Sequence, residues 1–402
     1  MPNLAKISVE NFLSLAKLDL TLAALNVLVG PNGSGKTNIL KVFQFLGDVA
    51  RIDLIPAIDR MGNFEEIIFR GSNRKSRTIR LHFEGMMSPH ASRRALDEYT
   101  LAFWQRQFPV PRDSTPRRLV QRNETILIKR TAGRGRRITL RGGSARVAPI
   151  DPVRSQSVPG PLSVQNASTG LATLRRLGEE YEAAGVDAIA KVFENLRLFE
   201  VDVERIRRPS RLAGSTVLRS DGANLAAYLQ YLSQEHRMIL DQIENDVNYI
   251  LPSFKAFKFT RLGGSDEAVR VDLIEDKLDG VTPLARASYG TIRAIALFAM
   301  LSDPKPPQLT CLEEVDHGLH PHALDRLVDR IREASARTQI ILATHSPALV
   351  NRLHPSELVV VEREASDGST RAIRPDTQLV SQLQDETGYG LGELWFSGTL
   401  GG

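Results

Sequence analysis

Apolar residues follow two spacings along the chain, and each spacing predicts a different secondary structure. Alternating or short continuous apolar runs predict strands at residues 6–12, 18–22, 25–29, 78–83, 99–103, 125–129, 138–140, 254–259, 269–274, 309–312 and 338–343. Apolar residues three and four positions apart predict helices at 171–177, 186–196 and 224–251, the last of which ends at Pro252. The mixture of both kinds of element predicts an α/β fold.

A glycine-rich loop directly follows the strand expected at 25–29. Its sequence, residues 30–37, is Gly-Pro-Asn-Gly-Ser-Gly-Lys-Thr, and apolar residues at helical spacing come next. A strand, a glycine-rich turn and a helix in this order wrap backbone N–H groups around a polyphosphate. Lys36 is expected to contact the β- and γ-phosphates, and the hydroxyl of Thr37 to hold Mg²⁺. The nucleotide-binding residues expected in this loop are Asn32, Gly33, Ser34, Gly35, Lys36 and Thr37.

The composition is that of an ordinary globular protein with room for more than one lobe. The chain has 402 residues, of which 42% are hydrophobic and 25% are charged. Its single cysteine, Cys311, excludes an intrachain disulfide and a cysteine-rich zinc site. No leader sequence precedes the first strand, and no apolar run approaches the roughly 20 residues that cross a bilayer. We therefore expect a cytoplasmic protein with no membrane partner.

Basic residues are concentrated in one part of the chain. The formal net charge is +5, but residues 70–160 contain 20 Lys and Arg against 6 Asp and Glu. Because strand patterns and Arg-rich turns alternate in this segment, it predicts a basic β-lobe. Two interpretations are open: a face that binds DNA or RNA through phosphates, or a solvated strand surface. The candidate nucleic-acid contacts are Arg117, Arg118, Arg134, Arg136 and Arg137.

The aromatic residues of this segment favour a structural interpretation. Tyr99, Phe103 and Trp104 fall in or next to an expected strand. Large aromatic residues in such positions are more often buried than exposed as platforms for stacking bases. We therefore expect all three in the core.

Two later strands end in polar residues that suit phosphoryl transfer. The strand at 309–312 is followed by Glu313 and Glu314, and the strand at 338–343 by Thr344 and His345. Successive side chains of a strand point in opposite directions, so one glutamate can help to hold Mg²⁺ while the other polarises the attacking water. His345 is expected at the carboxyl edge of a parallel sheet, where ligands bind.

In their order, these motifs resemble the ABC-type ATPases of the RecF, SMC and OLD branch. The resemblance is strongest to standalone AAA-type ATPases of bacteria and archaea, some of which act in anti-phage defence operons. It covers nearly the whole chain and includes the loop with the following Asn38 and the segments 7–12, 221–225, 288–291, 313–314, 318–321, 344–347 and 392–395. It implies an ABC-type P-loop NTPase with a mixed sheet core, an antiparallel β-lobe and a helical insertion, without a TOPRIM nuclease domain.

The resemblance also implies roles for individual residues. Ser288 and Gly290 correspond to the signature motif, which faces the γ-phosphate bound by the other subunit of an ATP-sandwich homodimer. Glu313 corresponds to the Walker B residue near Mg²⁺, Glu314 to the residue that positions or deprotonates water, and His345 to the switch histidine. Asn38 joins the nucleotide-binding residues, and residues 316–320 form the loop that contacts the partner subunit. The catalytic set is then Lys36, Glu314 and His345, and the metal set is Thr37 and Glu313.

Several positions depart from the pattern of the family. Glu313 stands where aspartate is more usual, Val315 where proline is common, and Tyr289 at a variable signature position. No glutamine is identified as the Q-loop ligand. No aromatic residue is identified for stacking on adenine, so the preference for ATP over GTP rests on the resemblance alone.

The expected boundaries follow from these motifs and from composition. Residues 144–169 are rich in Pro, Ser, Gln and Gly and predict a linker. The chain is expected to consist of an N-terminal ATPase segment (1–75), a basic β-lobe with the linker (76–165), a helical insertion (166–260) and a C-terminal ATPase segment (261–402).

The leading hypothesis is a Mg²⁺-dependent ATPase that dimerises around ATP and acts as a nucleic-acid-responsive clamp or sensor. Its expected setting is anti-phage defence, with a separate, nuclease-like effector protein. The alternatives are a slow-turnover ATP-binding scaffold that regulates a protein partner, and an ATPase of DNA repair or recombination. A transporter ATPase is disfavoured because about 275 residues separate the two Walker motifs. An OLD-type nuclease is disfavoured because only about 55 residues follow His345, without a convincing carboxylate cluster.

Overall fold

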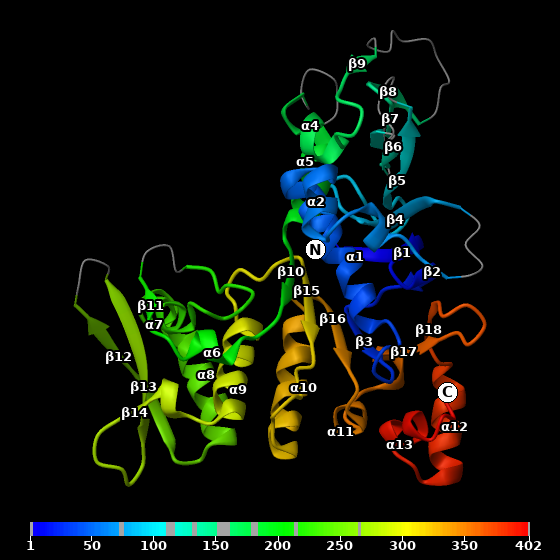
Figure 1. Cartoon of the computed structure of the whole chain (residues 1–402). Coiled ribbons are helices and arrows are strands. Elements are labelled where there is room, and N and C mark those ends of the chain that lie inside the picture. The colour runs from blue at the N-terminus through cyan, green and yellow to red at the C-terminus, as the bar shows by residue number, and fades with distance from the viewer. Residues whose placement is uncertain are drawn as a thin grey trace. The chain divides into compact units, whose positions relative to one another are not determined.

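The computed structural model describes residues 3–71, 76–109, 117–130, 135–150, 161–177, 184–212, 216–263 and 267–400 (Figure 1). The chain divides into two compact units. The first unit consists of Met1–Asn26, Gly30–Leu196 and Val359–Arg374. The second unit consists of Val27–Val29, Arg197–Leu358 and Pro375–Gly402.

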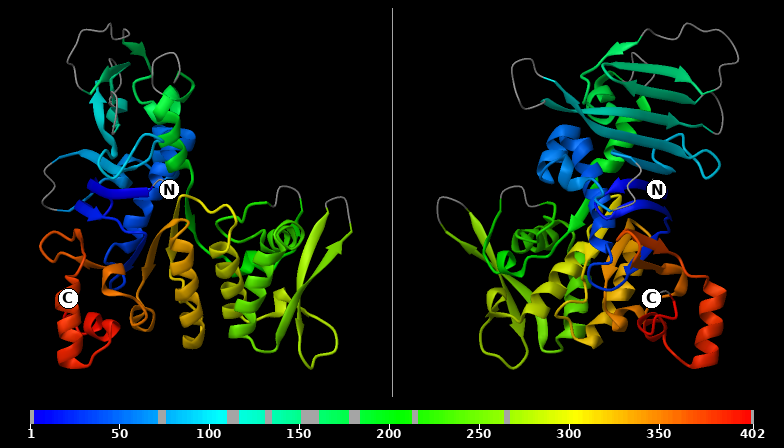
Figure 2. Two further views of the ribbon diagram at one scale, coloured as in Figure 1. Left: turned by 180° about the vertical axis from the view of Figure 1, so that it is seen from behind. Right: turned by 45° about the vertical axis from the view of Figure 1, so that its right-hand side comes forward.

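An antiparallel sheet forms the centre of the first unit (Figure 2). Among the described residues its strand order is β2-β1-β4-β5-β6-β7-β8-β9. The strands are β1 (Asn3–Phe12), β2 (Leu15–Thr21), β4 (Thr78–Met86), β5 (Asp97–Phe108), β6 (Arg117–Ile128), β7 (Arg136–Arg141), β8 (Ser144–Pro149) and β9 (Leu162–Ser163). Side chains alternate between the two faces, so that Ile79, Leu81 and Phe83 of β4 are all buried.

Helix α1 (Lys36–Ile52) packs on the buried face of this sheet through aromatic rings. The ring centroids of Phe43 and Phe83 are 6.1 Å apart, and those of Phe45 and Phe103 are 5.7 Å apart. Such ring pairs add to the free energy gained by burying apolar surface. They hold the first helix, and with it the loop that precedes it, against the sheet. The short helices α2 (Leu54–Arg60) and α3 (Phe64–Ile67) follow.

Three helical segments and a pair of strands also belong to the first unit. They are the helical segments α4 (Gly170–Thr173), η1 (Leu174–Leu177) and α5 (Ala184–Glu194), and the antiparallel pair β17 (Leu358–Arg363) and β18 (Thr370–Ile373). Gly170 lies so close to Leu140 and Ile126 that a Cβ would come within 3.2 Å and 3.4 Å of their side chains. This contact places α4 directly on the sheet.

Part of the expected linker is a strand. Residues 144–149 form β8, in which Ala145 and Val147 alternate onto the buried face. Two apolar residues are too few to reveal a strand among so many Pro, Ser and Gly residues. Residues 151–160, which include the prolines 152 and 159, lie outside the described residues.

Parallel strands form the centre of the second unit. β15 (Leu309–Glu313) pairs in parallel with β16 (Gln339–Thr344), and the strand order is β10-β15-β16-β3. β10 spans Leu196–Phe199 and β3 spans Leu25–Val29. The residues of β15 and β16 are almost all buried, as expected for strands covered on both faces.

A second, smaller sheet of this unit is antiparallel, with the order β11-β13-β12 and β14 beside β13. Its strands are β11 (Ser210–Arg211), β12 (Phe254–Leu262), β13 (Ala268–Glu275) and β14 (Thr282–Pro283). The helices of the unit are α6 (Val203–Ile206), α7 (Leu225–Glu235), α8 (Arg237–Ile250), η2 (Leu284–Arg286), α9 (Tyr289–Leu301), α10 (Pro321–Ser335), α11 (Pro347–Val350), η3 (Pro355–Glu357), α12 (Thr377–Thr387) and α13 (Leu391–Phe396). In helix α9, all residues from Ile292 to Leu301 are buried.

Two helices differ from the sequence-based expectation. The helix expected at 224–251 is divided into α7 and α8 at His236, whose φ of −141° and ψ of 52° are not helical. The helix expected to include Leu196 ends at Glu194, and Leu196 begins strand β10. In both places the apolar spacing continues across the break, so periodicity alone does not reveal it.

No helix within the described ranges is long and apolar enough to span a membrane.

Candidate functional site

The glycine-rich loop of the first unit has the backbone conformation of a phosphate-binding loop. Gly33 and Gly35 have φ angles of 79° and 107°, which only glycine adopts without strain. A Cβ on Gly35 would overlap the hydroxyl of Thr370, and one on Gly30 would overlap the carbonyl oxygen of Val361. At Gly33, by contrast, no atom lies within 4 Å of the Cβ position. The loop therefore packs against the rest of the unit at Gly30 and Gly35, and has free space at Gly33.

Lys36 closes the loop from the other end. Its Nζ donates hydrogen bonds to the carbonyl oxygens of Gly30, at 2.7 Å, and of Pro31, at 2.9 Å. The hydroxyl oxygen of Ser34 is buried and has no hydrogen-bond partner among the described residues. A lysine, an unpartnered hydroxyl and the N-terminus of a long helix all favour an anion. The loop residues therefore fit the triphosphate of a nucleotide.

Three residues that the sequence did not single out hold this loop in place. Thr370 Oγ1 donates to the carbonyl oxygen of Ser34 at 2.9 Å, and lies 2.7 Å from Ser14 Oγ. Asn38 Nδ2 donates to the same Ser14 Oγ at 2.7 Å. The third, Arg363, donates from Nη1 to the carbonyl oxygen of Gly33 at 3.2 Å. No local pattern marks Ser14, Arg363 or Thr370, because their partners are far away in the sequence.

A cavity of about 730 Å³ lies beside these residues in the first unit. Its walls include Ser14 and Asn38, which touch the loop network, and Phe69 and Arg70 from the segment after α3. The remaining wall residues are Leu13, Glu66, Ile68, Gly71, Arg363, Asp367 and Gly368. Phe69 borders this cavity, but only 3% of the residue is exposed.

In the second unit, Glu314 follows strand β15 in an uncommon backbone conformation. Its φ is 49°, a left-handed value that costs free energy for a residue with a Cβ. Its N–H donates to the carbonyl oxygen of Ala343 at 2.9 Å, which ties it to the end of β16. This turn directs the chain away from the strand immediately after Glu313.

The Glu314 carboxylate lies between two histidines. Its Oε1 is 3.7 Å from His345 Nδ1, and its Oε2 is 3.8 Å from His317 Nδ1. The side chains of Glu314 and His345 are both 45% exposed, so both can reach a ligand. Asp316 accepts a hydrogen bond from Thr344 Oγ1 at 2.7 Å, which links the loop after Glu314 to the residue before His345. The structure thus brings together two of the expected catalytic residues, Glu314 and His345.

Ser288 and Gly290 lie at the start of helix α9 in the same unit. Ser288 is the N-cap of the helix, and its Oγ accepts a hydrogen bond from the N–H of Thr291 at 3.1 Å. A Cβ on Gly290 would overlap the carbonyl oxygen of Gly318, so glycine is needed for this close approach. Tyr289 between them is 41% exposed. The N-terminus of a helix of 13 residues is again suited to an anion.

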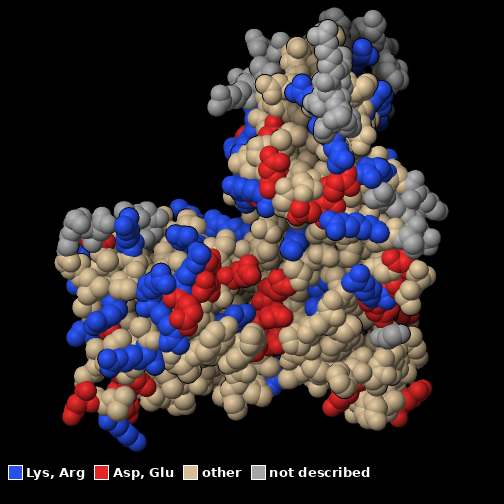
Figure 3. Space-filling view, viewed as in Figure 1, with Lys and Arg blue, Asp and Glu red and all other residues tan. Residues whose placement is uncertain are grey.

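At least one of the basic residues expected to bind nucleic acid has an acidic neighbour. Arg117, Arg118 and Arg137 are exposed, and Arg136 is half-buried. Arg118 Nη1 lies 4.0 Å from Glu65 Oε1. Arg134 lies outside the described residues. On the face drawn in Figure 3, acidic side chains lie among the basic ones around the sheet of the first unit.

The three aromatic residues of this segment differ in burial. Tyr99 and Phe103 are fully buried, and Trp104 is half-buried. The expectation of a core position is therefore met completely by two of them and partly by the third.

The fold and these motifs define a P-loop ATPase of the ABC type, in the branch that includes RecF, SMC and OLD proteins. The chain belongs to the family described as "AAA domain, putative AbiEii toxin, Type IV TA system", whose profile matches residues 25–151 and 169–351. No curated protein matches the sequence significantly.

Solved structures with a similar fold are heads of SMC proteins. One is the SmcHead bound to the C-winged helix domain of ScpA, with 16% identity, a TM-score of 0.54, and coverage of 94% of this chain and 99% of that chain. Another is the Smc head domain with an extended coiled coil bound to the C-terminal domain of ScpA derived from Pyrococcus furiosus, with 14% identity, a TM-score of 0.53, and coverage of 97% and 100%. At this identity the likeness shows the fold alone. The expected fold class, with a mixed sheet and an antiparallel lobe, is confirmed.

Proposed function

We propose that this protein is a Mg²⁺-dependent ATPase whose ATP-bound form is a homodimer, and that the dimer acts as a clamp or sensor responsive to nucleic acid. Membership of a P-loop ATPase family supports ATP binding and hydrolysis. The observation that carries the proposal is the position of Glu314. Its carboxylate is exposed at the end of a central strand and lies within 4 Å of His345.

The chemical roles follow from the side chains. Lys36 and the N–H groups of residues 32–37 bind the phosphates of ATP, and Asn38 supports the loop through Ser14. Thr37 and Glu313 are the residues that would hold Mg²⁺, which offsets negative charge on the phosphate oxygens when it is bound. Glu314 orients a water molecule and accepts its proton as the oxygen attacks the γ-phosphorus and the bond to ADP breaks. His345 donates a hydrogen bond to the γ-phosphate.

The cavity beside the loop supports binding of a whole nucleoside triphosphate. It is large enough for a nucleoside, and polar residues such as Ser14 and Asn38 line it. We propose that the ribose and base lie in this cavity. Its residues are therefore the place to look for the preference between ATP and GTP.

The dimer and the effector are proposed on other grounds. Ser288 and Gly290 lie at a helix N-terminus suited to a phosphate, and in ABC-type ATPases this motif completes the site of the other subunit. The family description refers to a toxin and a toxin–antitoxin system, which supports a role in defence with a separate effector protein. DNA repair or recombination remains the alternative setting.

A slow-turnover scaffold is the second candidate function. It is favoured by the acidic neighbours of the basic lobe, such as Glu65 beside Arg118, because paired charges contribute little to phosphate binding. In this case ATP would hold the protein in one form while it regulates a protein partner, and nucleic acid would not change the rate of hydrolysis.

The first test is the affinity for ATP and the rate of phosphate release of the full chain. Lys36→Ala is expected to abolish ATP binding. Glu314→Gln is expected to bind ATP as tightly as the wild type and to hydrolyse it at least about 100-fold more slowly, since it removes the base but not the phosphate site. Glu333→Gln, which changes an exposed glutamate of α10, is the matched control and should leave the rate unchanged. A Glu314→Gln protein that hydrolyses ATP at the wild-type rate would contradict the proposed role.

A further inference from the structure

Arg293 is a buried arginine on helix α9, in the second turn after Ser288. Only 6% of the residue is exposed. Among the described residues it forms no ion pair with a carboxylate, and its Nε has no hydrogen-bond partner. Because burying a charge without a counter-ion is costly, such a residue needs another reason for its position.

The guanidinium group of Arg293 joins three separate segments of the second unit. Its Nη2 donates to the carbonyl oxygen of Glu314 at 2.7 Å and approaches that of Glu313 at 3.4 Å. Its Nη1 donates to the hydroxyl of Tyr289 at 3.3 Å and approaches the carbonyl oxygen of Val201 at 3.5 Å. One side chain therefore contacts the signature turn, the carbonyls of both glutamates and the segment after β10.

The contact with Glu314 has a specific consequence. The left-handed turn at Glu314 points its carbonyl oxygen inward, where it accepts the short hydrogen bond from Arg293. A charged donor on a carbonyl forms a stronger bond than a neutral donor does. Arg293 thereby compensates for the strain of a conformation that directs the Glu314 carboxylate toward His345.

The signature turn is fixed against the same region by direct packing. Gly290 lies against the carbonyl of Gly318, and the ring of Tyr289 lies 5.7 Å from that of His317. His317 in turn lies 3.8 Å from the Glu314 carboxylate. A movement of the signature turn would therefore be transmitted to Glu314 through two routes, the Arg293 side chain and the loop that carries His317.

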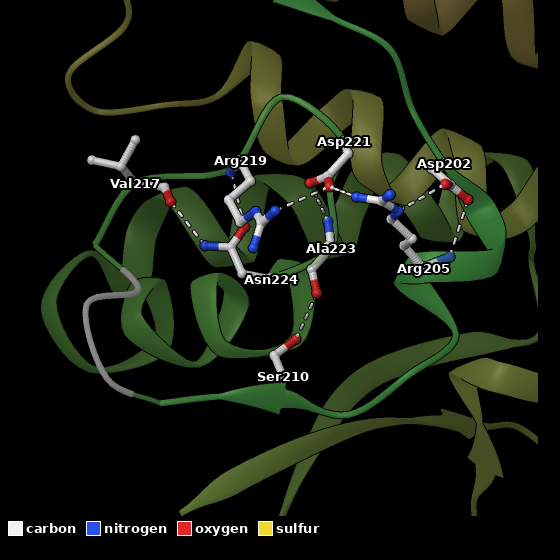
Figure 4. Close-up of polar contacts among 8 residues, drawn as sticks. All are labelled: Asp202, Arg205, Ser210, Val217, Arg219, Asp221, Ala223 and Asn224. Atoms are coloured by element: carbon white, nitrogen blue, oxygen red, sulfur yellow. Dashed lines mark hydrogen bonds and ion pairs between the residues drawn. The ribbon is translucent and has the colours of Figure 1, made fainter. Parts of the chain in front are cut away.

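The residues that follow Val201 are linked to Asp221 by polar contacts, some of which Figure 4 shows. The Asp221 carboxylate accepts hydrogen bonds from Arg205, at 2.8 Å, and from the N–H of Ala223, at 3.1 Å. The backbone N–H of Asp202 donates to the carbonyl oxygen of Asp221 at 3.0 Å. The Asp-Gly-Ala-Asn sequence at 221–224 thus fixes the segment next to Val201. Val201, Asp221 and Tyr289 all line one cavity of about 510 Å³.

We propose that Arg293 is a positioning residue that couples the signature turn to Glu314. When the signature turn of one subunit binds a phosphate, Arg293 holds Glu314 of the same subunit in the conformation that orients water. This inference rests on the proposed ATPase function. It adds that the signature turn and Glu314 change conformation together. A subunit would then hydrolyse its own ATP only when its signature turn also binds a phosphate.

The test is a double-mutant cycle on the rate of ATP hydrolysis by the full chain. Arg293→Gln is expected to lower kcat about tenfold or more and to change KM for ATP less than about twofold, because the phosphate-binding loop is untouched. Ser288→Ala should lower kcat about tenfold in the wild type but less than about threefold in the Arg293→Gln protein, since the coupling is already lost. Arg293→Lys, which keeps the charge but fewer donors, should recover part of the rate.

Arg337 provides the matched control. It also binds two carbonyl oxygens, those of Asp303 and Leu301, but at the other end of α9. Arg337→Gln should destabilise the protein as much as Arg293→Gln without uncoupling Ser288. Strictly additive effects of Arg293→Gln and Ser288→Ala would overturn the inference, as would an unchanged kcat in Arg293→Gln.

Two further outcomes are distinguishable. If Arg293→Gln does not fold, Arg293→Lys takes its place in the same cycle and is judged by the same additivity. If the wild-type chain neither binds nor hydrolyses ATP, the proposed function fails with this inference. If the wild-type chain hydrolyses ATP but the effects of Arg293→Gln and Ser288→Ala are additive, only the role proposed for Arg293 is wrong.

Discussion

At the scale of single residues, backbone conformation decides where the functional groups lie. Glu314 has a left-handed φ of 49°, and Gly33 and Gly35 have φ angles of 79° and 107°. The glycines adopt these values freely, whereas Glu314 depends on hydrogen bonds from its own N–H and to its own carbonyl oxygen. The two glycines and the glutamate are thus fixed by different means.

Gly35 provides the first prediction. Gly35→Ala adds a Cβ in a left-handed conformation and forces it onto Thr370 Oγ1, which itself bonds to Ser34. The variant is expected to lose at least about tenfold in ATP affinity and to be destabilised by more than the roughly 1–2 kcal/mol of the left-handed backbone alone. Equilibrium dialysis with ATP and urea unfolding measure the two effects.

The control for Gly35 is another left-handed glycine. Gly388, with a φ of 71°, ends α12 and has no atom within 4 Å of its Cβ position. Gly388→Ala should lower the free energy of unfolding only by the cost of the left-handed backbone, and should leave ATP affinity unchanged. Equal losses of affinity in both variants would contradict the role assigned to the loop.

Glu124 on β6 provides a prediction about pH. Its carboxyl is fully buried, which raises its pKa to about 7, although the N–H of Gly170 at 2.6 Å and Arg122 at 3.9 Å oppose the shift. The other groups that face it are Asp53, whose charge raises the pKa further, and the hydroxyl of Tyr99, which lowers it. Between about pH 4.5 and pH 7, the carboxyl of Glu124 is therefore protonated more in the folded chain than in the unfolded chain.

The sign of the effect follows from linkage. Because the folded-state pKa is above the unfolded value of about 4.5, the free energy of unfolding is highest below pH 4.5 and falls as the pH rises toward 7. The contribution of Glu124 to this fall is about 3 kcal/mol. Urea unfolding between pH 5 and 8 should show the fall in the wild type and a flatter profile in Glu124→Gln.

A matched variant tests whether this effect belongs to Glu124. Glu98→Gln changes a partly exposed glutamate of the same sheet, which pairs with Lys129. It should leave the pH profile unchanged. The interpretation is wrong if the profile of Glu124→Gln is as steep as that of the wild type.

At the scale of elements, one buried carboxylate joins two helices of the second unit. Asp246 on α8 is completely buried and accepts hydrogen bonds from Arg326, at 2.6 Å, and Arg330, at 2.7 Å, both on α10. Asp246→Asn removes the buried anion that both guanidinium groups share, although Arg330 keeps its ion pair with Glu333, and is expected to cost about 3 kcal/mol of unfolding free energy. Asp241→Asn, at a half-exposed pair with Arg237 on the same helix, should cost less than about 0.5 kcal/mol. Equal urea midpoints for the two variants would contradict this account.

Sequence patterns predict some parts of this structure and miss others, and the elements show which. The loop with α1, the strand before Glu313 and the strand before His345 are consecutive patterns, and all three appear in the structure. The site residues Ser14, Arg363 and Thr370 were not predicted, because Ser14 and Thr370 are 356 positions apart and no local spacing records their contact. The break at His236 was not predicted either, since the apolar period continues through it.

At the scale of the whole molecule, the distribution of charge leads to a prediction about nucleic acid. If the basic lobe binds DNA or RNA through phosphates, the triple variant Arg117→Gln, Arg118→Gln and Arg137→Gln should bind more weakly. The slope of log affinity against log salt concentration should fall by about one for each contact removed. Filter binding or fluorescence anisotropy over a range of salt concentrations measures this.

A second triple variant controls for total charge. Lys255, Lys258 and Arg261 are exposed on β12, so replacing all three by glutamine removes the same charge from another surface. Its salt dependence should equal that of the wild type. If both variants lose the same affinity, binding follows net charge and the lobe has no special role.

The central claim is that ATP joins two copies of the chain, and the most direct measurement is sedimentation of Glu314→Gln with ATP, with ADP and without nucleotide. The predicted result is a dimer with ATP but not with ADP or without nucleotide, and a weaker ATP-dependent dimer when the Glu314→Gln protein also carries Ser288→Ala. A protein that binds ATP tightly but sediments as a monomer at every concentration would contradict the account.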